Sequence, residues 1–143
     1  MKPPIASLEV TYLIHATEDE RKVEAAVERL LGLAPAFERD ALIGHFGNRI
    51  VRTKAHLTGE AAVSAFKHLV MSLPPDVRSA LARELGAHVD EHSTLYLRLD
   101  KQQLVSGSPE LGTTDAVRVK VKLRLYTLKG GAMEFYAREL EGR

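Results

Sequence analysis

The 143-residue chain contains no cysteine. Disulfide bonds, a thiol nucleophile and a cysteine-based zinc site are therefore excluded. No stretch approaches 18 consecutive apolar residues, and the start, MKPPIASLEV, lacks the apolar run of a signal peptide. We therefore expect a soluble cytoplasmic protein without a membrane-spanning helix.

The sequence also lacks a strong excess of charge, since its formal net charge is +1. A basic nucleic-acid-binding protein is not evident from this total, so such a function must follow from how the charges are distributed. Apolar residues make up 45% and charged residues 27%, which is ordinary for a globular protein and too apolar for a disordered one. Repeats, linkers and low-complexity segments are absent, and we expect residues 1–143 to form a single domain.

The most regular stretch of the chain is VRVKVKLRLY, residues 117–126. Valine and leucine alternate there with arginine and lysine, which predicts a strand with one buried side and one solvated side. The solvated side would carry a row of positive charge about 20 Å long, with no acid between the cations. Because like charges this close repel one another, we expect either a polyanion or acids from neighbouring strands to face them.

Hydrophobic periodicity and turn residues predict the other elements. Strands are expected at 5–15, 37–43, 50–57, 94–101 and 117–126, and helices at 17–31, 58–73, 76–85 and 133–140. Thr17 and Glu20 have the spacing of a helix-capping box, Asp76 is expected to cap the third helix, and residues 105–115 are expected to form a loop. Strands with one polar side suit an α+β fold, in which helices pack on one face of a mostly antiparallel sheet.

The other face of this sheet is expected to be solvated and basic, because three strands point cations and tyrosines toward it. Phosphates dominate nucleic-acid affinity through lysine and arginine, and exposed aromatic rings can stack on unpaired bases. The alternative is that these cations only keep the sheet soluble and discourage edge-to-edge aggregation. The expected RNA-binding residues are Arg49, Arg52, Lys54, Tyr96, Arg98, Lys101, Arg118, Lys120, Lys122, Arg124 and Tyr126.

The segment GHFGN, residues 44–48, predicts a tight turn between two strands. In one interpretation, backbone N–H groups around Gly44 and Gly47 form an anion-binding nest, with His45 and Asn48 adding contacts to a phosphate. In the other, the glycines serve only the geometry of a hairpin turn, and Phe46 packs onto the core.

The sequence also contains residues that could serve catalysis or bind a metal. His88, Asp90, Glu91 and His92 are clustered in the sequence, and the two histidines would share a helical face as zinc ligands can. Gly86 indicates that the helix has already ended, and no third ligand stands at a diagnostic spacing. No nucleophile has a recognisable motif around it. We therefore expect no enzyme, no metal and no cofactor, with a metal-dependent hydrolase as the remaining catalytic alternative.

Four segments carry a family resemblance. They are ATEDE with KV at 22–23, GHFGN with Ile50, DE at 90–91 with LYLRLDKQ, and Asp115 with VRVK at 117–120. Together they resemble an archaeal family of RNA-binding proteins that are predicted exosome subunits, in the same order over nearly the whole chain. The resemblance implies RNA as a ligand, a link to archaeal RNA processing, and exosome or other RNA-processing subunits as partners.

The same resemblance implies a fold like that of the large-subunit ribosomal protein that contacts 5S ribosomal RNA. It also implies a double-stranded-RNA-binding-domain fold, although the element order predicted here differs from the α-β-β-β-α order of that module. A protein-interaction module remains as an alternative function. In that case the basic face would dock an acidic subunit of an RNA-processing complex.

Overall fold

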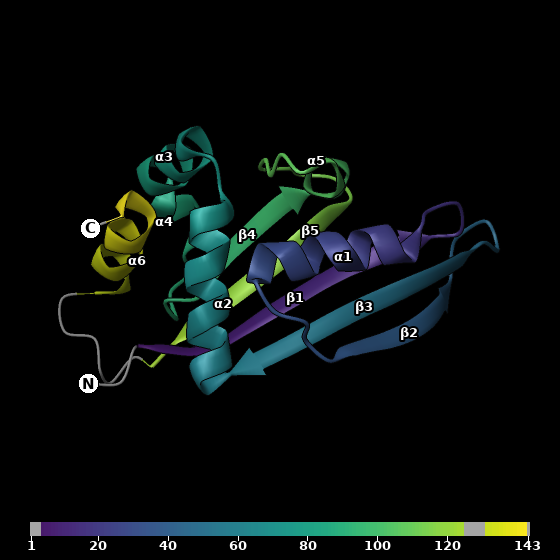
Figure 1. Ribbon diagram of the computed structural model, residues 1–143, viewed down its shortest axis with the longest axis horizontal. Helices are drawn as coiled ribbons and strands as arrows, with labels where there is room; N and C mark the ends of the chain where they lie inside the picture. Colours follow the sequence, from purple (N-terminus) through teal and green to yellow (C-terminus); the bar gives the residue numbers. More distant parts are fainter. Residues whose placement is uncertain (1–3, 125–130, 143) are drawn as a thin grey trace.

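The computed structural model describes residues 4–124 and 131–142 (Figure 1). Five strands form one antiparallel sheet in the order β2-β3-β1-β5-β4. The strands are β1 (Ile5–His15), β2 (Phe37–Ile43), β3 (Arg49–Thr58), β4 (Leu95–Asp100) and β5 (Ala116–Leu123). The helices are α1 (Glu20–Leu31), α2 (Gly59–Ser72), α3 (Pro75–Arg83), α4 (Leu85–His88), α5 (Lys101–Ser106) and α6 (Ala132–Glu141). The predicted α+β fold with an antiparallel sheet is confirmed.

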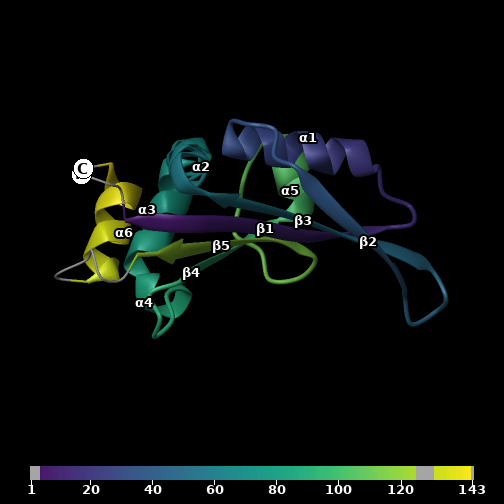
Figure 2. The same cartoon turned by 90° about the horizontal axis from the view of Figure 1, so that it is seen from below.

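Helices α1 and α2 cover one face of the sheet and leave the opposite face open (Figures 1 and 2). Helix α2 contacts β1 and β3, and α1 contacts α2 and α5. Helices α3, α4 and α6 gather beside the start of β4 (Figure 1). None of the helices in the described ranges is both long and apolar enough to cross a lipid bilayer.

Alternation along the strands decides which side chains enter the core. Leu8, Val10 and Tyr12 of β1 are buried, because successive strand residues point to opposite faces and these point toward the helices. Tyr136 of α6 is also buried, and its hydroxyl donates to the carbonyl of Ser93 at 2.8 Å and that of Val121 at 3.2 Å. These hydrogen bonds tie α6 to the sheet.

The N-cap of helix α1 lies two residues later than the sequence predicts. Asp19 is its N-cap and accepts the backbone N–H of Arg21 at 3.0 Å. Glu18 accepts the N–H of His15 at 2.9 Å, so it closes the turn before the helix. The expected capping box of Thr17 with Glu20 is therefore wrong, because the nearer carboxylate of Asp19 takes that role.

The third predicted helix is two helices in the structure. Helix α3 starts with Pro75, which needs no backbone N–H at this position, and Asp76 lies in the first turn without capping it. Helix α4 then contains Gly86, where the sequence indicated an end.

The chain turns sharply after β4, where the sequence predicts a strand to residue 101 and a loop from 105. Asp100 instead caps helix α5, and its carboxylate accepts the N–H of Gln103 at 2.9 Å. Gly107, at φ 92°, ends this helix in a conformation that favours glycine. Asp100 and Gln103 have the capping-box spacing. This sequence pattern could have indicated α5.

Candidate functional site

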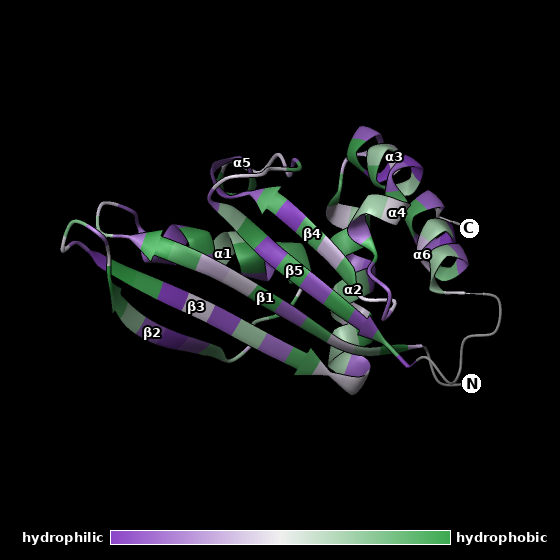
Figure 3. Cartoon of the chain, turned by 180° about the vertical axis from the view of Figure 1, so that it is seen from behind, coloured by the Kyte–Doolittle hydropathy of each residue, from purple (hydrophilic) through white to green (hydrophobic). Residues whose placement is uncertain are grey.

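The open face of the sheet carries cations from β3, β4 and β5 in adjacent rows. Figure 3 shows the sheet from this side, with hydrophilic and hydrophobic residues alternating along these strands. Thr11 of β1 pairs with Lys54 on one side and with Arg118 on the other, and Arg118 pairs with Arg98. Directly opposed residues in an antiparallel sheet point to the same face. The next row along the strands holds His56, Glu9, Lys120 and Tyr96. Antiparallel pairing thus brings cations from three strands onto one surface.

The cations of β3 have carboxylate partners within the molecule. Arg52 Nη2 lies 3.1 Å from Asp40 Oδ2 of β2, and Lys54 Nζ lies 3.6 Å from Glu9 Oε2 of β1. Exposed ion pairs of this kind contribute only about 0–1 kcal/mol to stability. They nevertheless compensate part of the positive charge, so the basic face is less basic over β3 than the sequence predicts.

The cations of β4 and β5 differ in this respect. Arg98, Arg118 and Lys122 are exposed, and Lys120 is half-buried with its Nζ 5.8 Å from the centre of the Tyr96 ring. Within the described ranges, none of these four cations forms an ion pair. The uncompensated positive charge of the open face is therefore concentrated on β4 and β5.

Two hollows flank Tyr96 and Arg98. One has a volume of about 320 Å³ and lies on the open face, lined by Glu9, Thr11, Tyr96, Leu97, Arg98, Arg118, Val119 and Lys120. The other has a volume of about 560 Å³ and lies toward α4, lined by Glu84, Ala87, His88, Tyr96, Arg98, Leu111, Gly112 and Thr113. Both volumes lie within the range of about 300–1,000 Å³ that is typical of small-molecule sites. Both hollows are lined by charged and apolar residues.

Tyr96 is held in place by Asp90. Its hydroxyl donates to Asp90 Oδ2 at 3.1 Å, while Asp90 Oδ1 accepts the N–H groups of His92 and Thr94, both at 2.9 Å. The N–H of Thr94 is the main cause of the lowered pKa of Asp90, and the bond to Asp90 raises the pKa of Tyr96. At neutral pH an ionised carboxylate therefore anchors a neutral phenol, and the ring is fixed beside Lys120.

The sequence cluster His88, Asp90, Glu91 and His92 does not converge on a metal site. His88 Nδ1 lies 3.2 Å from the carbonyl oxygen of Tyr96, and His92 Nε2 lies 3.4 Å from Glu91 Oε1. Asp90 accepts hydrogen bonds within the same turn. We therefore assign these side chains to stabilising the turn before β4.

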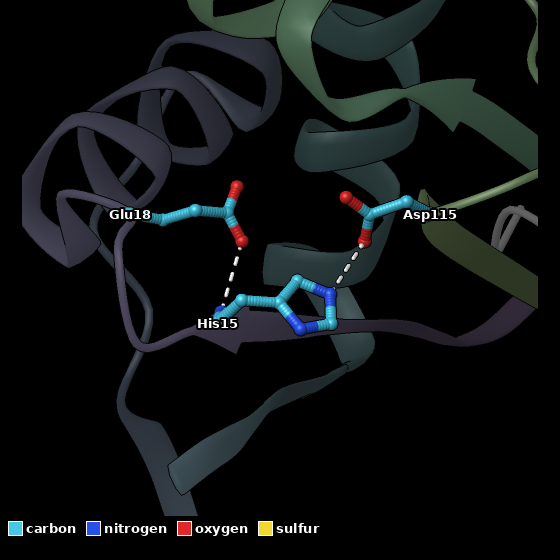
Figure 4. A group of neighbouring side chains, drawn as sticks. All are labelled: His15, Glu18 and Asp115. Carbon is cyan, nitrogen blue, oxygen red and sulfur yellow. Dashed lines mark hydrogen bonds and ion pairs between the residues drawn. The ribbon is translucent and has the colours of Figure 1, made fainter. Parts of the chain in front are cut away.

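A different group does converge: His15, Glu18 and Asp115 place ligand-type atoms within 4.8 Å of one another (Figure 4). Lys101 Nζ lies 2.7 Å from Glu18 Oε1 and 2.9 Å from Asp115 Oδ1, and it donates to the carbonyl of Leu13 at 2.7 Å. An ammonium group therefore already occupies the place between the two carboxylates. We interpret the cluster as an ion-pair network that joins the end of β1, the turn before α1, the start of α5 and the residue before β5.

Lys101 is only 1% exposed, so its predicted contact with RNA is wrong. The sequence could have indicated this burial, because Lys101 continues the alternating positions of the buried Leu95, Leu97 and Leu99. A lysine on the apolar side of a strand indicates a buried ammonium with acidic partners.

Arg49 does not join the basic face as predicted. Arg49 pairs with Ile43 and lies on the side of the sheet opposite to Arg52, because the two arginines are three positions apart and successive strand residues alternate between faces. Strand β5 ends at Leu123, so Arg124 lies beyond it, and Tyr126 is outside the described residues.

The turn at 44–48 closes on itself. The N–H of Gly44 donates to the carbonyl of Asn48 at 2.7 Å, and the N–H of Gly47 donates to that of Gly44 at 2.9 Å. The nest predicted from Gly44, His45, Gly47 and Asn48 is therefore wrong, because these glycine N–H groups are already bonded. The expectation that Phe46 packs on the core is also wrong, since this side chain is 90% exposed.

Comparisons with known proteins place this fold in a family. A family model described as RNA binding matches residues 7–123. An RNA-binding protein of Pyrococcus abyssi is 31% identical over 95% of this chain and 94% of its own length. A solved DUF54 protein from Archaeoglobus fulgidus is 29% identical, with a TM-score of 0.77 over 95% of this chain and 99% of that one. Another, from Methanothermobacter thermautotrophicus, is 26% identical, with a TM-score of 0.75 over 98% of each chain. The chain belongs to the RNA-binding family that the matching model describes.

Proposed function

We propose that this chain is a non-catalytic RNA-binding protein that holds RNA phosphates on the open face of β4 and β5. One observation supports this proposal most strongly. Four cations without a carboxylate partner in the described part of the chain lie around the fixed ring of Tyr96. These cations are Arg98, Arg118, Lys120 and Lys122.

The pairing of Arg98 with Arg118 supports an anionic ligand. These residues are directly opposed on neighbouring strands. Like charges in this position destabilise a sheet, by about 0.2–1 kcal/mol for a typical pair. A phosphate between the two guanidinium groups would turn this repulsion into attraction, because arginine binds phosphate through two parallel hydrogen bonds.

Tyr96 supports RNA over a simple anion. Its ring is partly exposed, its orientation is fixed by Asp90, and Lys120 lies over it. Such a ring can stack on an unpaired base while the neighbouring cations hold the backbone.

The side chains near Tyr96 support a non-catalytic role. His88 and Asp90, the groups that could transfer protons, form local hydrogen bonds that hold the Tyr96 turn. Glu9 lies against Lys54. These contacts commit the three side chains to local structure rather than to proton transfer with a substrate.

The resemblance of GHFGN and LYLRLDKQ to predicted exosome subunits extends the proposal to an RNA-processing complex. We propose that the chain acts beside exosome or other RNA-processing subunits, with RNA on its basic face. An acidic protein subunit docking on the same face is the competing proposal, because such a patch would also steer a negatively charged partner. Titration with RNA alone separates the two.

The test is a fluorescence-anisotropy titration of labelled single-stranded, hairpin and duplex RNA at low salt. We expect the wild type to bind, and the variant Lys120→Glu with Lys122→Glu to lose binding. The matched control is Lys22→Glu with Lys67→Glu, which changes net charge equally but acts on the helices that cover the other face. Absence of wild-type binding, or equal loss in both variants, would overturn the proposal.

A further inference from the structure

The hairpin formed by β2 and β3 extends past the start of α1, so that its turn projects beyond the sheet and helices (Figures 1 and 2). At its tip, Phe46 is 90% exposed and Ile43 is 78% exposed. Phe46 has the largest exposed fraction among the large apolar side chains of the described residues. An apolar ring in water contributes no burial energy to folding, so core packing does not account for its position.

The turn holds this ring outward. Gly44 and Gly47 close the turn with backbone hydrogen bonds, and Gly47 has a φ of 77°, which favours glycine. The Asn48 side chain lies where a Cβ on Gly44 would come within 2.5 Å of its Oδ1 atom. His45 packs edge-on against Phe46, with ring centres 5.0 Å apart. The loop therefore presents Phe46 on a closed and supported turn.

The charges around the tip favour a polyanionic partner. Residues 41–59 contain no aspartate or glutamate. They include three cations, Arg49, Arg52 and Lys54, of which Arg49 is exposed and has no partner within the described ranges. An exposed aromatic ring beside uncompensated arginine matches the way proteins hold unpaired nucleic-acid bases and their phosphates.

We infer that the hairpin tip is a second RNA contact, at which Phe46 stacks on an unpaired base and Arg49 faces a nearby phosphate. This inference rests on the proposed function. It also sets a minimum length for the RNA. Lys54 is level with Arg118, and the strand from Lys54 to Arg49 spans about 17 Å at 3.4 Å per residue. A stacked single strand rises about 3.4 Å per nucleotide step. It therefore needs about six nucleotides or more to cover these five steps.

The experiment compares a 4-nucleotide and a 12-nucleotide single-stranded RNA, each carrying one 2-aminopurine. For the 12-mer, we expect Phe46→Ala to lower affinity about 5- to 150-fold, the range expected for loss of one stacked base. It should also remove part of the 2-aminopurine quenching. Phe46→Tyr should keep both, because a phenol ring also stacks. For the 4-mer, which is too short to reach both contacts, all three proteins should bind alike.

Met71→Ala is the control, because Met71 is 79% exposed on α2 and its loss removes a similar exposed apolar side chain elsewhere. Circular dichroism checks that each variant folds. Wild-type binding that is unchanged in Phe46→Ala would overturn the inference and leave the proposed function standing. Failure of the wild type to bind either RNA would overturn both. Loss of self-association in Phe46→Ala, with unchanged RNA affinity, would assign the tip to contacts between copies.

Discussion

Neutralising Arg98 and Arg118 together should reduce both RNA affinity and its dependence on salt. Each phosphate that a cation neutralises contributes about −0.7 to the slope of log affinity against log salt for single strands. The four uncompensated cations of the open face, Arg98, Arg118, Lys120 and Lys122, therefore contribute about −2.8 to this slope, apart from the contact of Arg49 at the hairpin tip. Arg98→Gln with Arg118→Gln removes two of them and leaves a contribution of about −1.4. Between 50 and 200 mM salt, these contributions correspond to a loss of affinity of about 50-fold in the wild type and about 7-fold in the variant.

The matched variant is Arg52→Gln with Lys54→Gln, which changes net charge by the same amount on β3. Because Asp40 and Glu9 already lie against these cations, we expect a slope close to that of the wild type. Anisotropy titrations of one 12-nucleotide RNA at five salt concentrations measure all three slopes.

Folding stability gives an independent readout for the β4–β5 variant. Removing two directly opposed arginines should leave the free energy of unfolding unchanged or raise it by about 0.2–1 kcal/mol, since their repulsion is lost. Weaker binding with undiminished stability is the expected combination. A β3 variant whose slope falls as far as that of the β4–β5 variant would refute the assignment of RNA to β4 and β5.

Three further predictions concern the groups that hold the site in shape. Lys101→Met should lower the free energy of unfolding in urea by about 2–4 kcal/mol, because it leaves Glu18 without its ammonium partner. The Glu18 side chain is only 15% exposed. A loss below about 1 kcal/mol would contradict the ion-pair network. Gly112→Ala should lower thermal stability by about 1–3 kcal/mol, since its Cβ would lie 2.9 Å from the backbone of β4, and an unchanged melting temperature would argue against this contact. The pKa of Asp90 is lowered from its ordinary value of 3.8, so its stabilisation is complete above that value and is lost as pH falls through the lowered pKa. The ring NMR signals of Tyr96 should accordingly shift only below pH 3.8 and should show no such step in Asp90→Asn, whereas a step near neutral pH would disprove this anchor.

The shared basic face could be predicted, because the alternation of apolar and charged residues along each strand shows which side is buried and which is exposed. Arg98, Arg118 and Lys120 occupy positions between buried leucines or valines, and antiparallel pairing then forces them onto one surface. The compensation of Arg52 and Lys54 could not be predicted in the same way. It depends on which residues of β1 and β2 stand opposite β3, and alternation alone does not specify that register.

The hairpin tip shows a second limit of sequence reasoning. The glycines of GHFGN correctly indicate a turn, but nothing local says whether Phe46 folds back on the sheet or points into water. That depends on where α1 begins relative to the hairpin, which is a property of the packed molecule (Figure 1). The burial of Lys101, by contrast, was readable from its parity with Leu97 and Leu99.

The central position of β1 has a consequence for how the protein matures during synthesis. Leu8 of β1 aligns with Leu57 of β3 on one side and with Val121 of β5 on the other. The ribosome therefore completes β3 long before β5. Until β5 is made, the half-sheet of β1, β2 and β3 has one edge of β1 unpaired. The cations of the open face therefore come together only when β5 docks, because β5 carries three of them and is the strand through which Arg98 of β4 joins the sheet.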